Sequence, residues 1–202
     1  MSLSVFALNC TLKPSPNDSS CELLLRQALG AFAERGVYGE LLRAVDFNIK
    51  PGVSSDEGDG DDWPLLRSKI LAADIFLLGT PIWLGHPSSV CQRVLERLDA
   101  LLGETDDVGR MLSYGTVAGV AVVGNEDGAH HVSAQIFQGL NDLGFSLAPN
   151  AVTYWVGEAM QGTDYKDLPQ PPEKVAQTTQ TLARNSIHLA RLLKASQYPG
   201  EA

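Results

Sequence analysis

The sequence has few basic side chains and no long apolar run. Its 202 residues include 15 lysines and arginines against 24 aspartates and glutamates, so the formal net charge is −9. A surface of this sign does not attract the phosphates of nucleic acid or anionic lipid. No apolar stretch approaches the roughly 18 residues that a membrane-spanning helix needs. We therefore expect neither nucleic acid nor a membrane as a partner.

Cysteine is also scarce. Cys10, Cys21 and Cys91 are too few and too scattered for a disulfide framework or a C-x-x-C metal site. An odd number of thiols suits a reducing compartment, and the first residues lack the basic start of a signal peptide. These absences predict a cytoplasmic protein. With 44% hydrophobic residues, the chain can form one globular domain. We place this domain at residues 3–196 and a C-terminal tail at 197–202.

Short apolar runs alternate with segments of helical period, which is typical of a parallel sheet with helices on both faces. The predicted strands are residues 3–9, 40–46, 74–79, 117–123 and 146–154. The predicted helices are residues 23–36, 88–102, 131–143 and 172–194. Residues 50–62 and 157–172 are polar and rich in glycine or proline, so we expect a solvated loop and a long connection there. The predicted fold class is α/β, a single doubly wound five-stranded parallel sheet.

Sheets of this kind bind ligands at the carboxyl ends of their strands, which directs attention to three loops. The first, residues 9–22, has no glycine, and this excludes a Rossmann or Walker A phosphate loop. It has hydroxyls and one lysine before a helix that Ser19 and Glu22 would begin as a capping box. A helix start attracts phosphate, and the candidate donors are Thr11, Lys13, Ser15, Ser19 and Ser20. An ordinary capped turn is the alternative.

The second loop, residues 79–89, follows the most apolar strand and contains a tryptophan. Trp83 lies between Ile82 and Leu84 and would offer a flat apolar wall, with backbone amides nearby, to a planar heterocycle. The alternative is that Trp83 packs inward, as most aromatic side chains do. Ser89 and Gln92 form a second capping box, which would begin the next helix.

The third loop, residues 123–131, has polar residues between two glycines and would lie flat against a ligand edge. His130 and His131 do not indicate a metal site, because adjacent residues on a helix face apart and no third ligand stands at a recognisable spacing. No pairing of nucleophile and base is visible, and Cys10 and Cys91 are expected to be small core hydrophobes. We therefore predict no catalytic side chain, so that any chemistry belongs to a cofactor.

Together the three loops resemble those of the flavodoxin-like NAD(P)H-dependent FMN reductases and quinone reductases. The resemblance covers roughly residues 3–193 and is most specific at N-C-T-L-K-P-S-P after the first strand and T-P-I-W-L-G after the third. It implies the strand order 2-1-3-4-5. It also implies that FMN is bound by three groups of residues: Thr11, Lys13, Ser15, Ser19 and Ser20 at the phosphate, Pro81, Ile82, Trp83, Leu84 and Gly85 at the isoalloxazine ring, and Asn125, Glu126, Asp127 and Gly128 at the flavin edge.

The activity that the resemblance implies is hydride transfer from NAD(P)H through bound FMN to a small acceptor, such as a quinone or free flavin. It also implies a homodimer or homotetramer. Two features depart from the family pattern: Lys13 stands where members often have arginine, and Asn125 to Asp127 stand where others have a glycine-rich loop. An arginine would offer bidentate hydrogen bonds that a lysine cannot.

Two other functions fit the same fold class. One is a flavodoxin-type electron carrier that binds FMN without NAD(P)H turnover, although such carriers have a shorter phosphate loop that contains glycine. The other is a signalling domain of receiver type, which would require acidic residues after the first strand, where Asn9 and Cys10 stand.

Overall fold

A computed structural model describes residues 2–159 and 161–200 of the protein. Five parallel strands form its sheet: β1 (Ser4–Asn9), β2 (Tyr38–Arg43), β3 (Ile75–Trp83), β5 (Val117–Gly124) and β6 (Ser146–Val156). Their order is β2-β1-β3-β5-β6, which is the predicted order 2-1-3-4-5 when only the long strands are counted. A two-residue strand, β4 (His86–Pro87), pairs antiparallel with the end of β3. The predicted flavodoxin-like fold class is confirmed.

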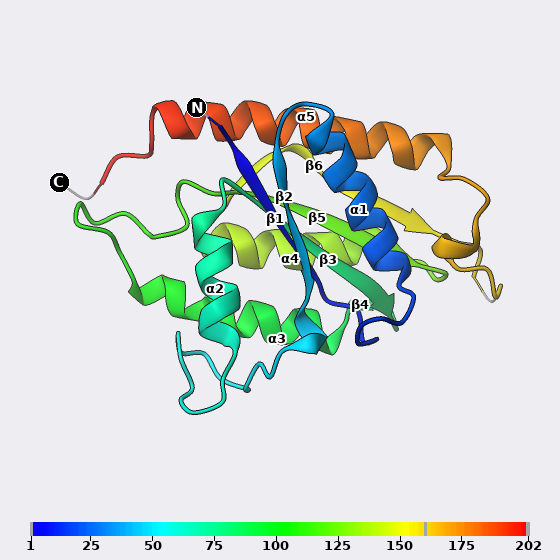
Figure 1. Ribbon diagram of the computed structural model, residues 1–202, viewed down its shortest axis with the longest axis horizontal. Coiled ribbons are helices and arrows are strands. Elements are labelled where there is room, and N and C mark those ends of the chain that lie inside the picture. Colours follow the sequence, from blue (N-terminus) through cyan, green and yellow to red (C-terminus); the bar gives the residue numbers. More distant parts are fainter. Residues whose placement is uncertain (1, 160, 201–202) are drawn as a thin grey trace.

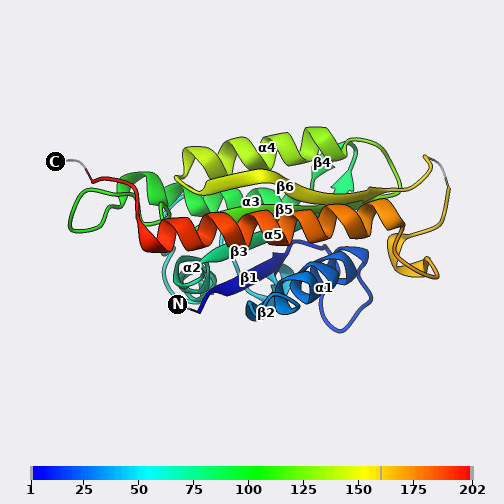
Figure 2. The same cartoon turned by 90° about the horizontal axis from the view of Figure 1, so that it is seen from above.

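Helices cover both faces of the sheet. On one face lie α1 (Ser20–Ala33) and α5 (Glu173–Ala195). Helix α5 runs along the top of Figure 1, and α1 slopes down from it on the right. On the other face lie α2 (Trp63–Ala72), α3 (Ser89–Leu98) and α4 (Ala129–Asp142). The view from above shows α4 and α1 on opposite sides of the strands (Figure 2). Two apolar cores, one on each face, therefore hold the sheet in place.

The central strands are apolar on both faces because both faces are covered. The first six residues of β3 and the first seven of β5 are buried. Close packing over β3 requires Gly79, since a Cβ atom there would lie 2.5 Å from Cδ1 of Leu25 and 2.9 Å from Sγ of Cys21. The glycine thus lets the first turns of α1 approach the carboxyl end of β3.

Several helices and strands begin or end at residues other than those predicted. Helix α1 starts at Ser20, directly after the predicted cap Ser19, and ends at Ala33, before the predicted stop at Gly36. Strand β2 ends at Arg43, with a 3-10 turn at Ala44–Asp46 in place of the predicted strand end. Strand β3 continues to Trp83 because its end pairs with β4. Helix α3 ends at Leu98, and a 3-10 turn at Asp99–Gly103 follows it.

Helix α2 is an element that the sequence analysis does not predict. It has no side-chain cap at its start, and a proline lies in its first turn. Its buried face consists of Trp63, Leu66 and Ile70 alone. Ten residues with so short an apolar stripe carry a weak helical signal, and the helix depends on packing against the sheet.

The expectation of a solvated loop at residues 50–62 is wrong for Asp61, because this loop folds around a buried arginine. Nη2 of Arg97 donates to Oδ2 of Asp61 at 2.8 Å, and both side chains are fully buried. The other guanidinium nitrogens donate to the carbonyl oxygens of Lys50 and Ser54. Burial acts to raise the pKa of Asp61, but backbone N–H donors and Arg97 lower it to about 2.

The last described residues pack against the opposite end of the sheet from the three loops. The Tyr198 ring lies edge-on to Tyr114, with centroids 5.6 Å apart, and its hydroxyl is 3.0 Å from Oγ of Ser146. The final part of the predicted tail, residues 201–202, lies outside the described residues. Within the described chain, no helix combines the length and the apolar character needed to cross a membrane. The cytoplasmic location stays a prediction.

Candidate functional site

A cavity opens at the carboxyl ends of β1, β3 and β5, where the sequence places the three loops. It is lined by Thr11, Leu12, Lys13, Ser19, Ser20, Cys21, Pro81, Ile82, Trp83, Val123, Gly124, Asn125, Trp155, Asp164 and Tyr165. The enclosed space is about 130 Å³. Pockets for small molecules usually hold about 300–1,000 Å³, so a nucleotide-sized ligand would extend beyond this hollow.

The first loop is ordered by short-range hydrogen bonds before it reaches α1. The Thr11 N–H donates to Oδ1 of Asn9 at 3.0 Å, and the Lys13 N–H donates to Oγ1 of Thr11 at 3.3 Å. Ser19 is the N-cap of α1, and its hydroxyl oxygen accepts the Glu22 N–H at 3.2 Å. This confirms one half of the predicted capping box. The carboxylate of Glu22 binds Arg26 and Arg43 instead of completing the other half.

Four of the five predicted phosphate-loop residues line the cavity, and Ser15 lies outside it. The Ser15 N–H donates to Oδ1 of Asp46 at 2.8 Å, and its hydroxyl donates to Oδ2 of the same carboxylate at 2.5 Å. The sequence pattern predicts that the Ser15 hydroxyl donates to a ligand. In the fold, a carboxylate at the end of the neighbouring strand already accepts it.

The second loop places an aromatic ring on the surface. Trp83 is 54% exposed at the end of β3 and lines the cavity together with Pro81 and Ile82. The alternative that Trp83 packs inward is therefore wrong. Leu84 and Gly85 form the tip of the hairpin, both with positive φ, and lie outside the cavity. Their position at the tip follows from the pairing of β3 with β4.

The start of α3 also differs from its prediction. Its N-cap is Ser88, not Ser89, and the Ser88 hydroxyl oxygen accepts the Cys91 N–H at 3.0 Å. The same hydroxyl donates to the carbonyl oxygen of Cys10 at 2.6 Å, and the Ser88 N–H donates to Oγ1 of Thr80 at 3.0 Å. One buried serine therefore joins the first loop to the second.

The third loop contributes one wall residue and a contact to the hairpin. Asn125 lines the cavity, whereas Glu126, Asp127 and Gly128 lie outside it. Oε1 of Glu126 accepts the Leu84 N–H at 3.0 Å, so this carboxylate supports the hairpin. Gly128 is the N-cap of α4 with φ of +112°, where a Cβ atom would lie 3.2 Å from Cα of Gly85.

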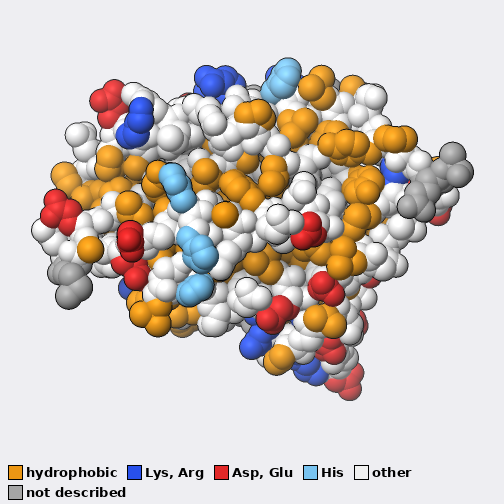
Figure 3. Space-filling model, turned by 180° about the vertical axis from the view of Figure 1, so that it is seen from behind, with side chains coloured by type: hydrophobic (Ala, Val, Ile, Leu, Met, Phe, Trp, Pro, Cys, Tyr) orange, Lys and Arg blue, Asp and Glu red, His pale blue; other side chains and the backbone are white. Residues whose placement is uncertain are grey.

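The histidines have separate partners. The His131 ring lies edge-on to His86 with centroids 5.4 Å apart, and His130 lies edge-on to Tyr154 at 5.2 Å. Viewed from behind, histidine side chains lie among hydrophobic ones on the surface of the molecule (Figure 3). Among residues 2–159 and 161–200, no three side chains of the metal-binding types gather closely enough to hold an ion.

Sequence reasoning missed the wall that comes from β6 and the segment after it. Trp155, Asp164 and Tyr165 line the cavity from this side. The Lys166 N–H donates to Oγ of Ser20 at 3.2 Å, and the Tyr165 hydroxyl donates to Oε1 of Gln27 at 2.6 Å. The connection read as a polar linker therefore closes on the start of α1. Its length was a signal, because long ordered loops are often functional.

The thiols near the cavity are not poised as nucleophiles. All three cysteines are buried, as predicted for Cys10 and Cys91. Burial raises the pKa of Cys21, and burial together with the neighbouring Cys91 raises the pKa of Cys10, well above the ordinary thiol value. A thiol in this state is protonated at neutral pH and serves packing.

The chemical character of the cavity lining suits flavin mononucleotide. At its phosphate end, the N–H groups of Glu22 and Leu23 donate to the hydroxyl and carbonyl oxygens of Ser19. Those of Ser20 and Cys21 have no partner among the described residues. Such first-turn amides bind a phosphate dianion. At the other end, the exposed face of Trp83 suits a flat apolar ring. That these residues bind FMN stays a prediction.

The chain is similar in sequence to known proteins. The chain is 33% identical over 210 residues to the 8-demethyl-8-aminoriboflavin-5'-phosphate synthase of Streptomyces davaonensis, covering 98% of this chain and 81% of that protein. It is 37% identical over 200 residues to a Mycobacterium bovis protein named divalent metal cation transporter MntH. That match covers 96% of this chain but spans only 29% of the length of the relative.

Solved structures are similar as well. A structure of RosB with bound 8-demethyl-8-formylriboflavin-5'-phosphate has a TM-score of 0.88 at 33% identity, covering 98% of this chain and 82% of that one. An NADH:FMN oxidoreductase, EMOB, has a TM-score of 0.64 at 15% identity, covering 95% and 90%, which supports the fold alone.

The sequence profile of the family described as NADPH-dependent FMN reductase matches residues 3–160. This confirms the family resemblance, and at the level of the family it confirms FMN as the flavin and NADPH as the reductant. The chain belongs to the NADPH-dependent FMN reductase family.

Proposed function

We propose that this protein passes hydride from NAD(P)H through bound FMN to a small acceptor, such as a quinone or free flavin. The observation that carries the proposal is a single cavity with two unlike ends. One end has the first-turn amides of α1 beside Lys13, and the other has the exposed ring of Trp83. A reductase of this family needs both a phosphate site and an open flat surface.

The residues of the cavity divide between binding and orientation. Thr11, Lys13, Ser19 and Ser20 would hold the phosphate, and Trp83 would set the plane of the ring. FMN, when bound, would supply the two-electron chemistry. The protein then contributes alignment, which is a large part of the rate in a reaction between two bound groups.

We propose in addition that a second copy of the chain completes the site. The enclosed hollow is small, and Leu84 at the hairpin tip is 90% exposed beside the half-exposed Trp83. A second copy over this hairpin would cover both side chains and enclose more of the flavin. Light scattering of the purified protein would give the mass of a dimer or tetramer. A monomer that still binds and reduces FMN would contradict this part of the proposal.

The test of the activity is NAD(P)H oxidation across a panel of quinones, FMN and riboflavin, with bound FMN measured in the same samples. We expect oxidation that depends on FMN and on the acceptor. Rapid-mixing absorbance should show bleaching of bound FMN by NADPH on the timescale of turnover. Bound FMN that NADPH does not reduce would favour the electron carrier and would contradict the reductase.

A second candidate is an enzyme that modifies the flavin itself. The relative from Streptomyces davaonensis is named as a synthase of an aminoriboflavin phosphate, and it aligns along almost the whole of this chain. Mass spectrometry of the flavin after incubation with FMN separates the two functions. Unchanged FMN after many turnovers supports the reductase, whereas a new mass at the flavin supports the second candidate.

A further inference from the structure

Arg43 is the last residue of β2, and Asp46 lies in the turn that follows. Neither residue lines the cavity at the ends of β1, β3 and β5, but both hold the backbone of the phosphate loop. Nη1 of Arg43 donates to the carbonyl oxygen of Lys13 at 3.1 Å. Asp46, in the 3-10 turn that follows, accepts the N–H and hydroxyl of Ser15 at 2.8 and 2.5 Å. The loop has no regular structure between Cys10 and Ser19, so contacts of this kind decide its shape.

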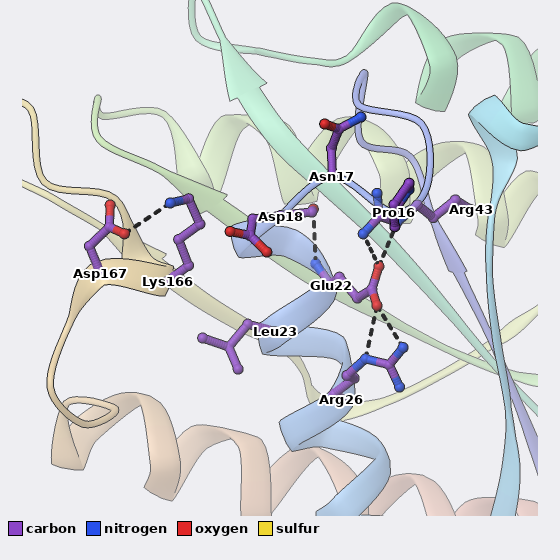
Figure 4. A pocket seen from close by; sticks show the side chains of 10 residues that line it. Pro16, Asn17, Asp18, Glu22, Leu23, Arg26, Arg43, Lys166 and Asp167 are labelled. Carbon is purple, nitrogen blue, oxygen red and sulfur yellow. Dashed lines mark hydrogen bonds and ion pairs between the residues drawn. The ribbon is translucent and has the colours of Figure 1, made fainter.

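The charge of Arg43 is not free for a ligand. Its Nε and Nη2 both contact Oε2 of Glu22 at 2.5 Å, and the Arg43 side chain is only 7% exposed. Oε1 of Glu22 pairs with Arg26 at 2.6 Å. Burial opposes ionisation, but the two guanidinium groups hold the pKa of Glu22 below its ordinary value. Figure 4 shows the Glu22 carboxylate between Arg43 and Arg26, with dashed lines to each.

We propose that Arg43 and Asp46 are positioning residues for FMN binding: they fix the backbone of the phosphate loop from behind and do not themselves contact the phosphate. The inference rests on the proposed binding of FMN. Glu22 aligns the guanidinium group of Arg43 by accepting from Nε and Nη2. The third nitrogen of Arg43, Nη1, then holds the Lys13 carbonyl oxygen in place. Asp46 sets Ser15 in the same way, which explains why that serine is turned away from the cavity.

The two residues allow a sharp test, because a positioning role depends on hydrogen-bond geometry more than on charge. Arg43→Lys keeps the charge but cannot reach both Glu22 and the Lys13 carbonyl with a fork of donors. Asp46→Asn loses the charge but keeps an oxygen for the Ser15 N–H. Asp46→Ala loses both. Lys69→Met is the matched control, since Lys69 of α2 pairs with Glu40 of β2, away from the loop.

The measurement is titration of each purified variant with FMN and, separately, with riboflavin, which has no phosphate, in the absence of NAD(P)H. We expect Arg43→Lys and Asp46→Ala to raise the Kd for FMN about tenfold, the effect of a misplaced group of donors. The Kd for riboflavin should stay within about twofold of wild type, within the scatter of surface substitutions. Asp46→Asn should recover most of the affinity, and Lys69→Met should bind both flavins like wild type.

Wild-type affinity for FMN in both Arg43→Lys and Asp46→Ala would overturn the inference. So would equal loss of FMN and riboflavin with a lowered unfolding midpoint, because this would indicate a purely structural role. The reductase proposal fails separately, when wild type binds FMN but NADPH does not reduce it. If wild type binds no FMN, both proposals are overturned. Asp46 is exposed, so its variants keep the test decisive even if those of Arg43 fold poorly.

Discussion

At the scale of the residue, Trp83 carries most of the predicted contact with the isoalloxazine ring. Because its side chain is 54% exposed, Trp83→Ala should change the free energy of unfolding little. Loss of an aromatic contact with a flat ring costs on the order of 1–2 kcal/mol, so the Kd for FMN should rise about tenfold. Fluorescence titration gives the Kd, and the visible spectrum of bound flavin should shift.

Leu84→Ala is the control for Trp83→Ala, because Leu84 is 90% exposed and lies outside the cavity. In a sample with the same oligomeric mass as wild type, it should bind FMN like wild type. If Trp83→Ala leaves both the affinity and the spectrum of the flavin unchanged, the second loop does not bind the ring.

Arg97 is a second residue whose removal should have a large effect, this time on stability. Arg97→Met leaves the Asp61 carboxylate buried without its cation. Loss of one partner of a buried ion pair costs about 3–5 kcal/mol. Chemical denaturation should show this loss, and the double variant Arg97→Met/Asp61→Asn should be more stable than Arg97→Met alone.

The control for Arg97 is Arg110→Met, which breaks a half-buried surface pair with Asp106. Surface pairs contribute about 0–1 kcal/mol, so this variant should unfold close to wild type. Equal effects of the two substitutions would mean that the loop at residues 50–62 does not depend on its buried arginine.

At the scale of the element, the start of α3 links two walls of the site. Ser88→Ala removes the N-cap and leaves the Cys10 carbonyl and the Cys91 N–H without their partner. A lost cap costs about 1 kcal/mol and a buried unsatisfied group about 1–3 kcal/mol. Urea unfolding should therefore show a loss of about 2–4 kcal/mol.

Ser89→Ala provides the comparison, since Ser89 is the cap that the sequence pattern predicts and Ser88 is the cap in the structure. The Ser89 variant should change stability by less than about 0.5 kcal/mol, as most surface substitutions do. A larger loss for Ser89→Ala than for Ser88→Ala would reverse this assignment of the helix start.

At the scale of the whole molecule, the acidic loop makes stability depend on pH. The pKa of Asp61 is about 2 in the folded protein and near 3.8 in its ordinary state, so the group binds a proton more readily when unfolded. The contribution of the Asp61 carboxylate to the free energy of unfolding is complete above about pH 4 and is lost as the pH falls toward 2. We expect a loss on the order of 1–2 kcal/mol, allowing for screening by solvent around the loop.

This dependence is measured as the free energy of unfolding in urea at several pH values between 2 and 5. Asp61→Asn has no carboxyl to titrate, so its stability should fall less over this window, from a lower starting value. Parallel curves for wild type and Asp61→Asn would show that other carboxyl groups cause the acid sensitivity.

The alternation of apolar runs and helical periods was enough to predict the sheet, its five long strands and four of the five helices. That information is local, because a strand buried on both faces is apolar at every position. Helix α2 escaped this reasoning because its buried face has three residues only. Likewise, four of the five phosphate-loop candidates lie at the cavity, since they follow a strand and precede a helix.

By itself, the sequence determined the fold class, the family and the loops that form the site. Tertiary structure alone decided which side chains of those loops face the cavity. Ser15 turns to Asp46, Glu22 turns to Arg43, and the segment around Asp164 forms a wall whose position the sequence pattern does not indicate. The physical reason is that a hydrogen bond between residues distant in the sequence depends on where the fold brings them together. Local periodicity contains no information about that.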